Sequence, residues 1–301
     1  MPTANASTSL TQRALAHARL GALALFTALA AGSVVSCDGG GDAAGSVSPV
    51  RAQALIAEFR EALKPVDVTT TSDVQDRAFH RATKLREELS RAGRAVGLAA
   101  LAAFKEQPDA ALDQQWPLLE VAAANCPEET EPLLVALITT YDGERGQGLA
   151  TQAVRILGDS SPKAAIALFE PMLRAPQEHK TKPAQEALVL GWVAAAKKLG
   201  LKEAKVLCDV VVDIRQPPDA RYAAVNQLPK FADERAAAAL REVLLEASSD
   251  GMLRRKAAQA LVEVAPRKLA CEVLQHVSEH ESDEHFLVFL GSMLDKHCAG
   301  L

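Results

Sequence analysis

Hydrophobic and polar residues alternate along this chain with the period of an α-helix. Leu253, Ala257, Leu261 and Val264 follow one another at intervals of three and four residues, which gathers them on one face of a helix. Residues 270–277 repeat this spacing. No alternation of period two, as expected for a half-buried strand, extends over a useful length. The pattern therefore predicts an all-α chain of amphipathic helices.

These amphipathic segments recur along the chain from about residue 109. Each is followed by a short break and a second apolar helix, and the breaks often hold proline, as at Ser161-Pro162 and Ala265-Pro266. Proline stops one helix and favours the first turn of the next. Successive centres are about 30–36 residues apart, the range of two-helix repeats. The centres lie near Leu118, Val154, Leu190, Val225, Ala258 and Val288, and the clearest predicted pairs are 152–173, 223–244 and 257–277.

The pattern resembles the HEAT-repeat α-solenoid over residues 109–297, and armadillo-like or irregular helical stacking is a near alternative. The resemblance implies a row of about five to six antiparallel helix pairs, each contacting mainly its neighbours. Residues 50–107 would supply N-terminal helices that can cap the row, and residues 108–301 the repeats. The second helices would line a concave, partner-binding face, at 129–141, 163–174, 202–213, 233–247 and 267–279.

The first residues have the pattern of a secretory signal. The basic residues Arg13 and Arg19 precede an uncharged apolar run over 20–35, which is too short to be a comfortable membrane span. The run ends in Val34-Val35-Ser36-Cys37, which resembles the lipobox of bacterial lipoproteins. The resemblance implies a signal peptide over 1–36 that is removed, and a diacylglyceryl group on the cysteine that follows it.

A polar, glycine-rich segment follows Cys37. Residues 38–46 carry no large hydrophobic side chain, so they suit a flexible tether between a lipid anchor and a folded domain. We therefore predict a linker over 37–49 and a lipid-anchored protein of the bacterial cell envelope that faces the periplasm. The inner and the outer membrane both stay open. The alternatives are a secreted protein in which Cys37 carries no lipid, and a membrane helix that is retained.

Composition narrows the classes of partner. The 301 residues are 49% hydrophobic and carry a net charge of −5. The apolar content allows a large core. The acidic balance argues against nucleic-acid binding, which requires a basic surface for the phosphates. We predict a protein or peptide partner, no nucleic acid, and contact with the membrane through the lipid anchor.

One group of metal-binding residue types occurs near the C-terminus. His276 and His280 are four residues apart and share a helix face, so they are the candidate metal ligands. Oxygen ligands could come from Glu279, Glu281, Asp283 and Glu284. The alternative is a polar last turn, where histidine is favourable beside the C-terminal helix dipole. The run from His280 to His285 has one residue too many for a zinc-protease motif.

The remaining candidate residues have structural interpretations. We interpret Cys208 and Cys271 as small core residues, and the spacing of Cys126, Cys208, Cys271 and Cys298 leaves open whether any of them form disulfides. Trp116 and Trp192 are expected in the core. The glycine-rich run 143–148 is expected to be a flexible turn between repeats, since it lacks the lysine of a phosphate-binding loop. The basic run 254–256 is expected to form a solvated face.

We find no catalytic motif in the sequence and therefore predict a protein that is not an enzyme and takes no cofactor. The predicted function is that of a membrane-anchored lipoprotein acting as a helical-repeat interaction scaffold in the cell envelope. Its partner-binding residues are unknown from sequence. Two alternatives stay open: a metal-binding or enzymatic site near the C-terminal histidines, and a purely structural spacer in the envelope.

Overall fold

The computed structural model describes residues 47–65, 72–107, 111–140, 143–175, 184–231, 233–246 and 250–300. The predicted signal peptide over 1–36, Cys37 and most of the linker lie outside these residues. The described residues belong to a single compact unit, Ser46–Leu301. Regular structure in the described part of the chain is helical throughout, which confirms the all-α prediction.

Fourteen α-helices and one short 3₁₀ helix occur in the described residues. They include a helix at each of the six centres named above. Pro49, Pro127, Pro162 and Pro218 each occupy the first position of a helix, where the missing N–H costs nothing. The helices are α2 Pro49–Ala62, α3 Ser72–Leu89, α4 Arg94–Glu106, α5 Leu112–Asn125, α6 Pro127–Thr140, α7 Gly143–Ser160, α8 Pro162–Arg174, α9 Gln185–Lys198, α10 Lys205–Val212, α11 Pro218–Gln227, η1 Leu228–Lys230, α12 Arg235–Leu245, α13 Gly251–Val264, α14 Arg267–His280 and α15 Glu284–Cys298.

Two glycine-containing segments have different structures. Gly93 separates α3 from α4 with a positive φ of 89°, a conformation that glycine adopts without strain. The prediction of a flexible turn at 143–148 is wrong, because α7 begins at Gly143 and includes this run. Three glycines lower helix propensity there, and packing of the rest of α7 overrides that preference.

The helices pair in a different register from the one predicted. Extensive contacts join α4 with α5, α6 with α7, α8 with α9, α10 with α11, α12 with α13, and α14 with α15. The predicted pairs α7–α8 and α13–α14 make fewer contacts, and α11 and α12 make very few. Each observed pair therefore combines the second helix of one predicted pair with the first helix of the next predicted pair. An apolar stripe shows that a helix is buried, but not against which neighbour.

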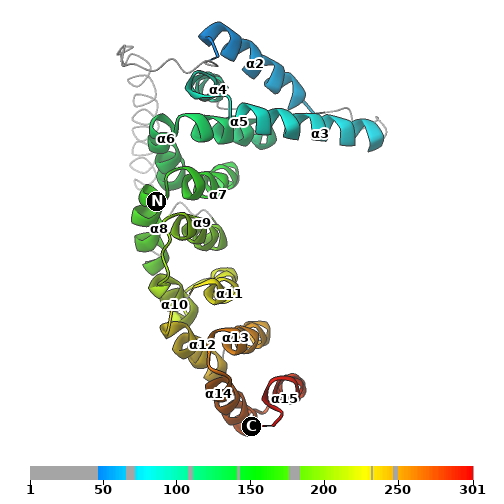
Figure 1. Cartoon of the computed structure of the whole chain (residues 1–301), viewed down its shortest axis with the longest axis vertical. Coiled ribbons are helices and arrows are strands. Elements are labelled where there is room, and N and C mark those ends of the chain that lie inside the picture. Colours follow the sequence, from blue (N-terminus) through cyan, green and yellow to red (C-terminus); the bar gives the residue numbers. More distant parts are fainter. Residues whose placement is uncertain are drawn as a thin grey trace, which may run out of the picture. The chain divides into compact units, whose positions relative to one another are not determined.

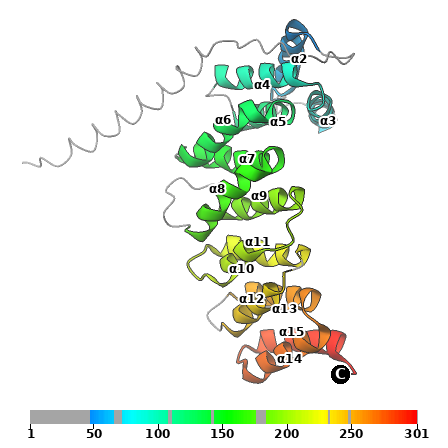
Figure 2. The ribbon, with the colours of Figure 1, turned by 60° about the vertical axis from the view of Figure 1, so that its left-hand side comes forward.

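The paired helices form two rows, which Figures 1 and 2 show from two directions. One row contains α5, α7, α9, α11, α13 and α15, and each of these helices contacts the next. The other row contains α6, α8, α10, α12 and α14. The described part of the chain is thus helical and repeat-like, with a continuous apolar core between the rows.

The same polar contact recurs at the start of three helices in the first row. The fourth residue is Gln115 in α5, Arg221 in α11 and Arg254 in α13. Each donates a hydrogen bond to a main-chain carbonyl at the end of the preceding helix, with distances of 2.6 Å to Gln107, 2.8 Å to Val211 and 3.2 Å to Leu244. Carbonyls at a helix end have no partner within the helix. These buried side chains therefore fasten one helix to the next at equivalent positions.

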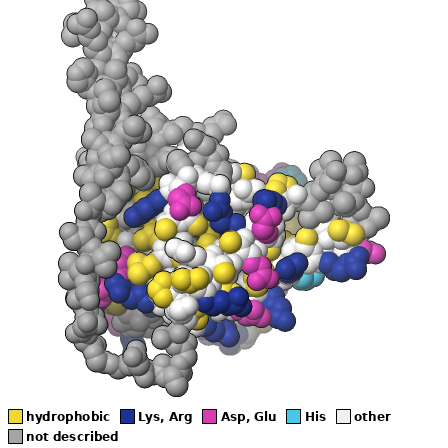
Figure 3. Space-filling view, turned by 90° about the horizontal axis from the view of Figure 1, so that it is seen from above, with side chains coloured by type: hydrophobic (Ala, Val, Ile, Leu, Met, Phe, Trp, Pro, Cys, Tyr) yellow, Lys and Arg dark blue, Asp and Glu magenta, His cyan; other side chains and the backbone are white. Residues whose placement is uncertain are grey.

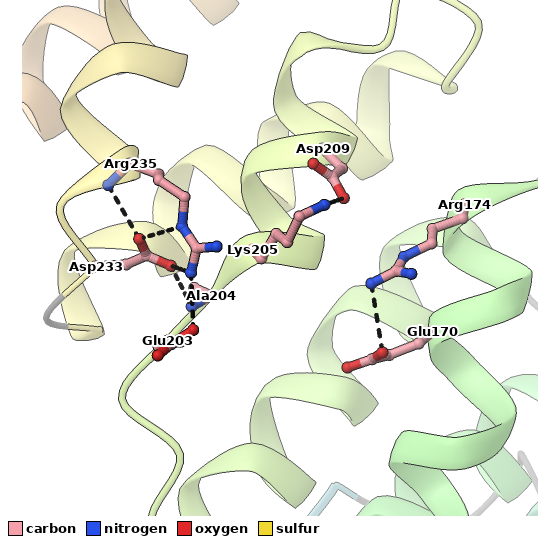
Figure 4. Close-up of polar contacts among 8 residues, drawn as sticks. All are labelled: Glu170, Arg174, Glu203, Ala204, Lys205, Asp209, Asp233 and Arg235. Atoms are coloured by element: carbon pink, nitrogen blue, oxygen red, sulfur yellow. Dashed lines mark hydrogen bonds and ion pairs between the residues drawn. The ribbon is translucent and has the colours of Figure 1, made fainter.

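Asp233 connects two repeats through one buried carboxylate (Figure 4). It accepts a hydrogen bond from the Ala204 N–H at 2.6 Å, just before α10, and others from Nε of Arg235 at 2.9 Å and Nη2 at 2.9 Å. The hydrogen bond from the Arg235 guanidinium lowers the pKa of Asp233 below its ordinary value. The carboxylate thus stays ionised and joins the linker before α10 to the start of α12.

A disulfide joins the last two helices. Cys271 in α14 bonds to Cys298 at the end of α15. Cys271 is buried, as predicted for a small core residue. The disulfide answers the question that the sequence left open, because the partner cysteine lies on the next helix rather than nearby in sequence. Cys126 and Cys208 are buried thiols outside any disulfide.

Reduction of this disulfide is expected to weaken the α14–α15 pair. The bond closes a loop with a sequence separation of 27 residues, and a loop of that size corresponds to about 3.5 kcal/mol of stabilisation. Hydrogen exchange should show lost protection in these two helices after reduction. The Cys271→Ser/Cys298→Ser variant should match the reduced protein and should not respond to reductant. Equal protection in the oxidised and reduced protein would contradict the expectation.

Candidate binding site

Two arginines enclose a half-buried tryptophan on the surface of α3, α5 and α7. The guanidinium carbons of Arg86 and Arg155 each lie 5.4 Å from the centre of the Trp116 ring. Both arginines pair with Glu120, which is one turn further along α5; the Arg86 contact measures 3.1 Å. We call these four residues the Trp116 cluster. Trp116 is therefore not the core residue that the sequence predicts.

An apolar groove opens on one side of the Trp116 cluster, between α2, α3 and α5. Its volume is about 500 Å³. The aromatic rings of Phe59, Phe79 and Trp116 line it, together with small residues of α3 such as Ala78 and Ala82. Phe79 is 70% exposed, and with the other apolar side chains of the groove it forms a continuous apolar surface of the kind that marks interaction sites.

A charged hollow of about 540 Å³ lies on the other side of the same cluster. Arg86 lines both the groove and the hollow. The hollow continues along α7 to Asp159 and reaches Lys198 of α9, whose ammonium group lies 3.5 Å from the Asp159 carboxylate. A ligand lying across both depressions would thus meet an apolar surface first and then paired charges.

Further apolar surface lies at the α2–α4 end of the described helices. Figure 3 looks down on this end and shows hydrophobic side chains gathered there, with charged ones around them. Val50 of α2 is 78% exposed and Leu98 of α4 is 39% exposed. Aromatic and arginine side chains, with apolar neighbours, are the types enriched where proteins bind one another.

Two serine hydroxyls of the charged hollow are engaged in hydrogen bonds, and the two free thiols of the described residues line neither depression. The hydroxyls of Ser90 and Ser160, which line the charged hollow, donate to main-chain carbonyls of their own helices at 2.8 and 2.9 Å. Burial raises the pKa of the Cys126 thiol, and it raises the pKa of Cys208 to about 11. Both thiols are therefore protonated at neutral pH and poor nucleophiles.

The C-terminal candidate residues divide into two groups. His276 and His280 do share a face of α14, with ring centres 4.5 Å apart, and Glu279 lies beside them. Glu281 instead pairs with Arg254 at 2.5 Å, and Asp283 caps α15. The run from His280 to His285 contains the turn between α14 and α15, so its two histidines do not share a helix.

Two further sequence interpretations had different outcomes. Trp192 is a core residue as predicted, and its ring N–H donates to Glu170 at 3.3 Å. The basic run 254–256 is not a uniformly solvated face, because Arg254 is buried with its guanidinium 4.4 Å above the Phe286 ring. Other ion pairs, such as Lys205–Asp209 in Figure 4, have exposed side chains.

Sequence reasoning missed Phe79, Arg86 and Arg155 as site residues. One signal was available on α3, where Gln75, Ala78, Phe79, Ala82 and Arg86 follow one helix face. Their convergence on Trp116 depends on the packing of α3 and α7 against α5, which no local pattern records.

No protein-family model, curated protein or solved structure matches this chain. Among the residues that the structure describes, no helix combines the length and the apolar character needed to cross a membrane.

Proposed function

We propose that this protein is a membrane-anchored, HEAT-like helical scaffold that binds a protein or peptide partner. The observation that carries the proposal is the apolar groove joined to the Trp116 cluster. Aromatic and arginine side chains with a nearby pocket are typical of the few residues that dominate binding energy at interfaces. The partner would place an apolar side chain in the groove and polar groups against Arg86 and Arg155.

Helix packing supports the solenoid part of the proposal. Helices α5, α7, α9, α11 and α13 contact one another more extensively than the helices of the other row do. The row whose helices lie closer together is on the inner side of a curved stack. In the observed register these helices are the second members of their pairs, and they carry Trp116 and Arg155. The proposed partner-binding face is therefore this row, rather than the segments we expected from sequence.

The envelope location rests on the N-terminal pattern and is compatible with the disulfide. Cys37 follows an uncharged run and a lipobox-like sequence. Cys271 and Cys298 form a disulfide, and disulfides persist in oxidising compartments such as the periplasm. Several acyl chains on one cysteine would give a stable attachment, because each buried methylene adds to membrane affinity.

Metabolic labelling with a fatty-acid analogue tests the anchor. We expect the wild-type chain, expressed in a bacterium, to be labelled and to sediment with membranes. Cys37→Ser should lose the label, since its hydroxyl replaces the thiol that accepts the diacylglyceryl group. The matched control is Cys126→Ser, which removes a buried thiol elsewhere. An unlabelled wild type, or label retained in Cys37→Ser, would reject the lipoprotein proposal.

Photo-crosslinking from membranes tests the binding site. A photoreactive phenylalanine analogue in place of Phe79 should crosslink a partner, because this side chain lies at the mouth of the groove. Trp116→Ala in the same chain should reduce the crosslinked product strongly. The analogue in place of Val288, an apolar residue of α15 that is 76% exposed, serves as the control and should give no such product. Crosslinking that is equal at both positions, or absent at both, would favour a structural spacer.

A further inference from the structure

Three side chains on the last turns of α14 have their possible metal-binding atoms close together. His276, Glu279 and His280 each offer one ligand atom, and these atoms lie within 4.8 Å of one another. All three side chains are exposed. They come from one continuous helix face, because positions separated by three and four residues are neighbours on a helix.

Neighbouring groups already orient two of these ligands. Nδ1 of His280 lies 2.8 Å from the main-chain carbonyl oxygen of His276. A carbonyl can only accept, so Nδ1 carries the proton and Nε2 keeps its lone pair available for a cation. Nε2 of Gln275 donates to the Glu279 carboxylate at 3.2 Å. Supporting hydrogen bonds of this kind fix ligand orientation in metal sites.

The nearby carboxylates do not compete for the same cation. Glu281 accepts hydrogen bonds from the N–H groups of Ser282 and Asp283 and pairs with Arg254. Asp283 accepts from the N–H groups that begin α15. These two acids therefore serve the turn between α14 and α15, and only Glu279 joins the histidines.

We propose that His276, Glu279 and His280 bind a divalent transition-metal ion of the zinc class. Two imidazole nitrogens and one carboxylate oxygen suit zinc, nickel or copper better than magnesium or calcium. Tetrahedral zinc needs its donors about 3.4 Å apart. Exposed side chains reach that separation from the observed one by small rotations about their χ angles. The three ligands leave one position for water, and the bound ion holds the last turn of α14 in its helical form.

Calorimetric titration of the full-length protein in detergent with zinc chloride tests the site. We expect one equivalent of zinc to bind, and His276→Gln and His280→Gln each to weaken binding about tenfold or more. Glu279→Gln should weaken it less. These residues are exposed, so none of the substitutions removes a core contact, and circular dichroism verifies the fold of each variant. Zinc should also slow hydrogen exchange at the end of α14 in the wild type, but not in His276→Gln or His280→Gln.

His285→Gln is the matched control, because His285 is an exposed histidine on the neighbouring helix. It should leave zinc binding unchanged. The proposal is overturned if the wild type binds no zinc, if either His276→Gln or His280→Gln binds as tightly as the wild type, or if His285→Gln loses binding equally. These outcomes concern the metal alone and leave the partner-binding proposal unaffected.

Discussion

Replacing Gly158 by alanine should lower the free energy of unfolding by about 3 kcal/mol, as expected for overpacking against a rigid neighbour. A methyl group at this position of α7 would lie 2.6 Å from the carbonyl oxygen of Gly191 in α9. The obstacle is main chain rather than a flexible side chain, so α7 and α9 have to move apart. The loss outweighs the better helix propensity of alanine. Urea unfolding followed by circular dichroism measures it.

Gly291→Ala is the matched control for this experiment. Gly291 lies inside α15, and a methyl group added there meets no atom within 4 Å. Alanine at such a position should stabilise the helix by about 0.5–1 kcal/mol. A Gly158→Ala variant as stable as Gly291→Ala would show that the two helices are not in close contact at this point.

Arg254→Met should be the other strongly destabilising change, costing about 3–5 kcal/mol because it leaves a buried carboxylate without its cation. The Arg254 and Glu281 side chains are 9% and 7% exposed and lie 2.5 Å apart. The arginine also donates to the Leu244 carbonyl at the end of α12. Thermal unfolding of the variant measures the loss. Arg255→Met removes the adjacent, less buried arginine and should cost less than about 1 kcal/mol.

A double-mutant cycle distinguishes the ion pair from simple packing. Adding Glu281→Gln to Arg254→Met should recover part of the lost stability, because the amide carries no charge that needs neutralising. The amide oxygen can still accept the hydrogen bonds that Oε1 receives from Ser282 and Asp283. Strictly additive effects of the two substitutions would contradict a coupled pair.

Acid should weaken the ion pair between Arg254 and Glu281. Burial raises the pKa of Glu281, but hydrogen bonds from the Asp283 N–H and from Arg254 outweigh burial, so its pKa lies below the ordinary value of 4.5. A carboxyl with a lowered folded-state pKa stabilises the fold above its unfolded pKa, and this contribution disappears as the pH falls through the folded value. Stability of the wild type should therefore fall more steeply below pH 4.5 than that of Glu281→Gln.

The sequence predicted the helices well and their partners poorly, for physical reasons that individual residues show. Leu253, Ala257 and Leu261 mark a buried face through local spacing alone, and proline marks where helices begin. Arg254 lies in the same helix but is buried only because Glu281 and Phe286 on later elements cover it. The Cys271–Cys298 pairing and the choice of neighbour for each helix depend likewise on tertiary packing, which a local period does not contain.

The candidate site residues also divide into those that local spacing predicts and those that only tertiary packing brings together. His276 and His280 were predictable as neighbours because one helix holds both. The Trp116 cluster was not, since it assembles from three helices and its two arginines are 69 positions apart in the numbering, at 86 and 155. Tryptophan in an apolar segment was interpreted as core, but its ring is half exposed and lies against two guanidinium groups.

Helix α3 forms one wall of the apolar groove and buries only Leu89, at its C-terminal end. In the middle of α3, Arg81 pairs with Glu58 of α2, and both of these side chains are exposed. Because no other residue of α3 is buried, moving this wall outward breaks few apolar contacts, whereas α5 forms the floor and buries seven residues. We therefore expect the groove to accept anchoring side chains of several sizes, so that affinity depends on the tryptophan floor and selectivity on the arginines beside it.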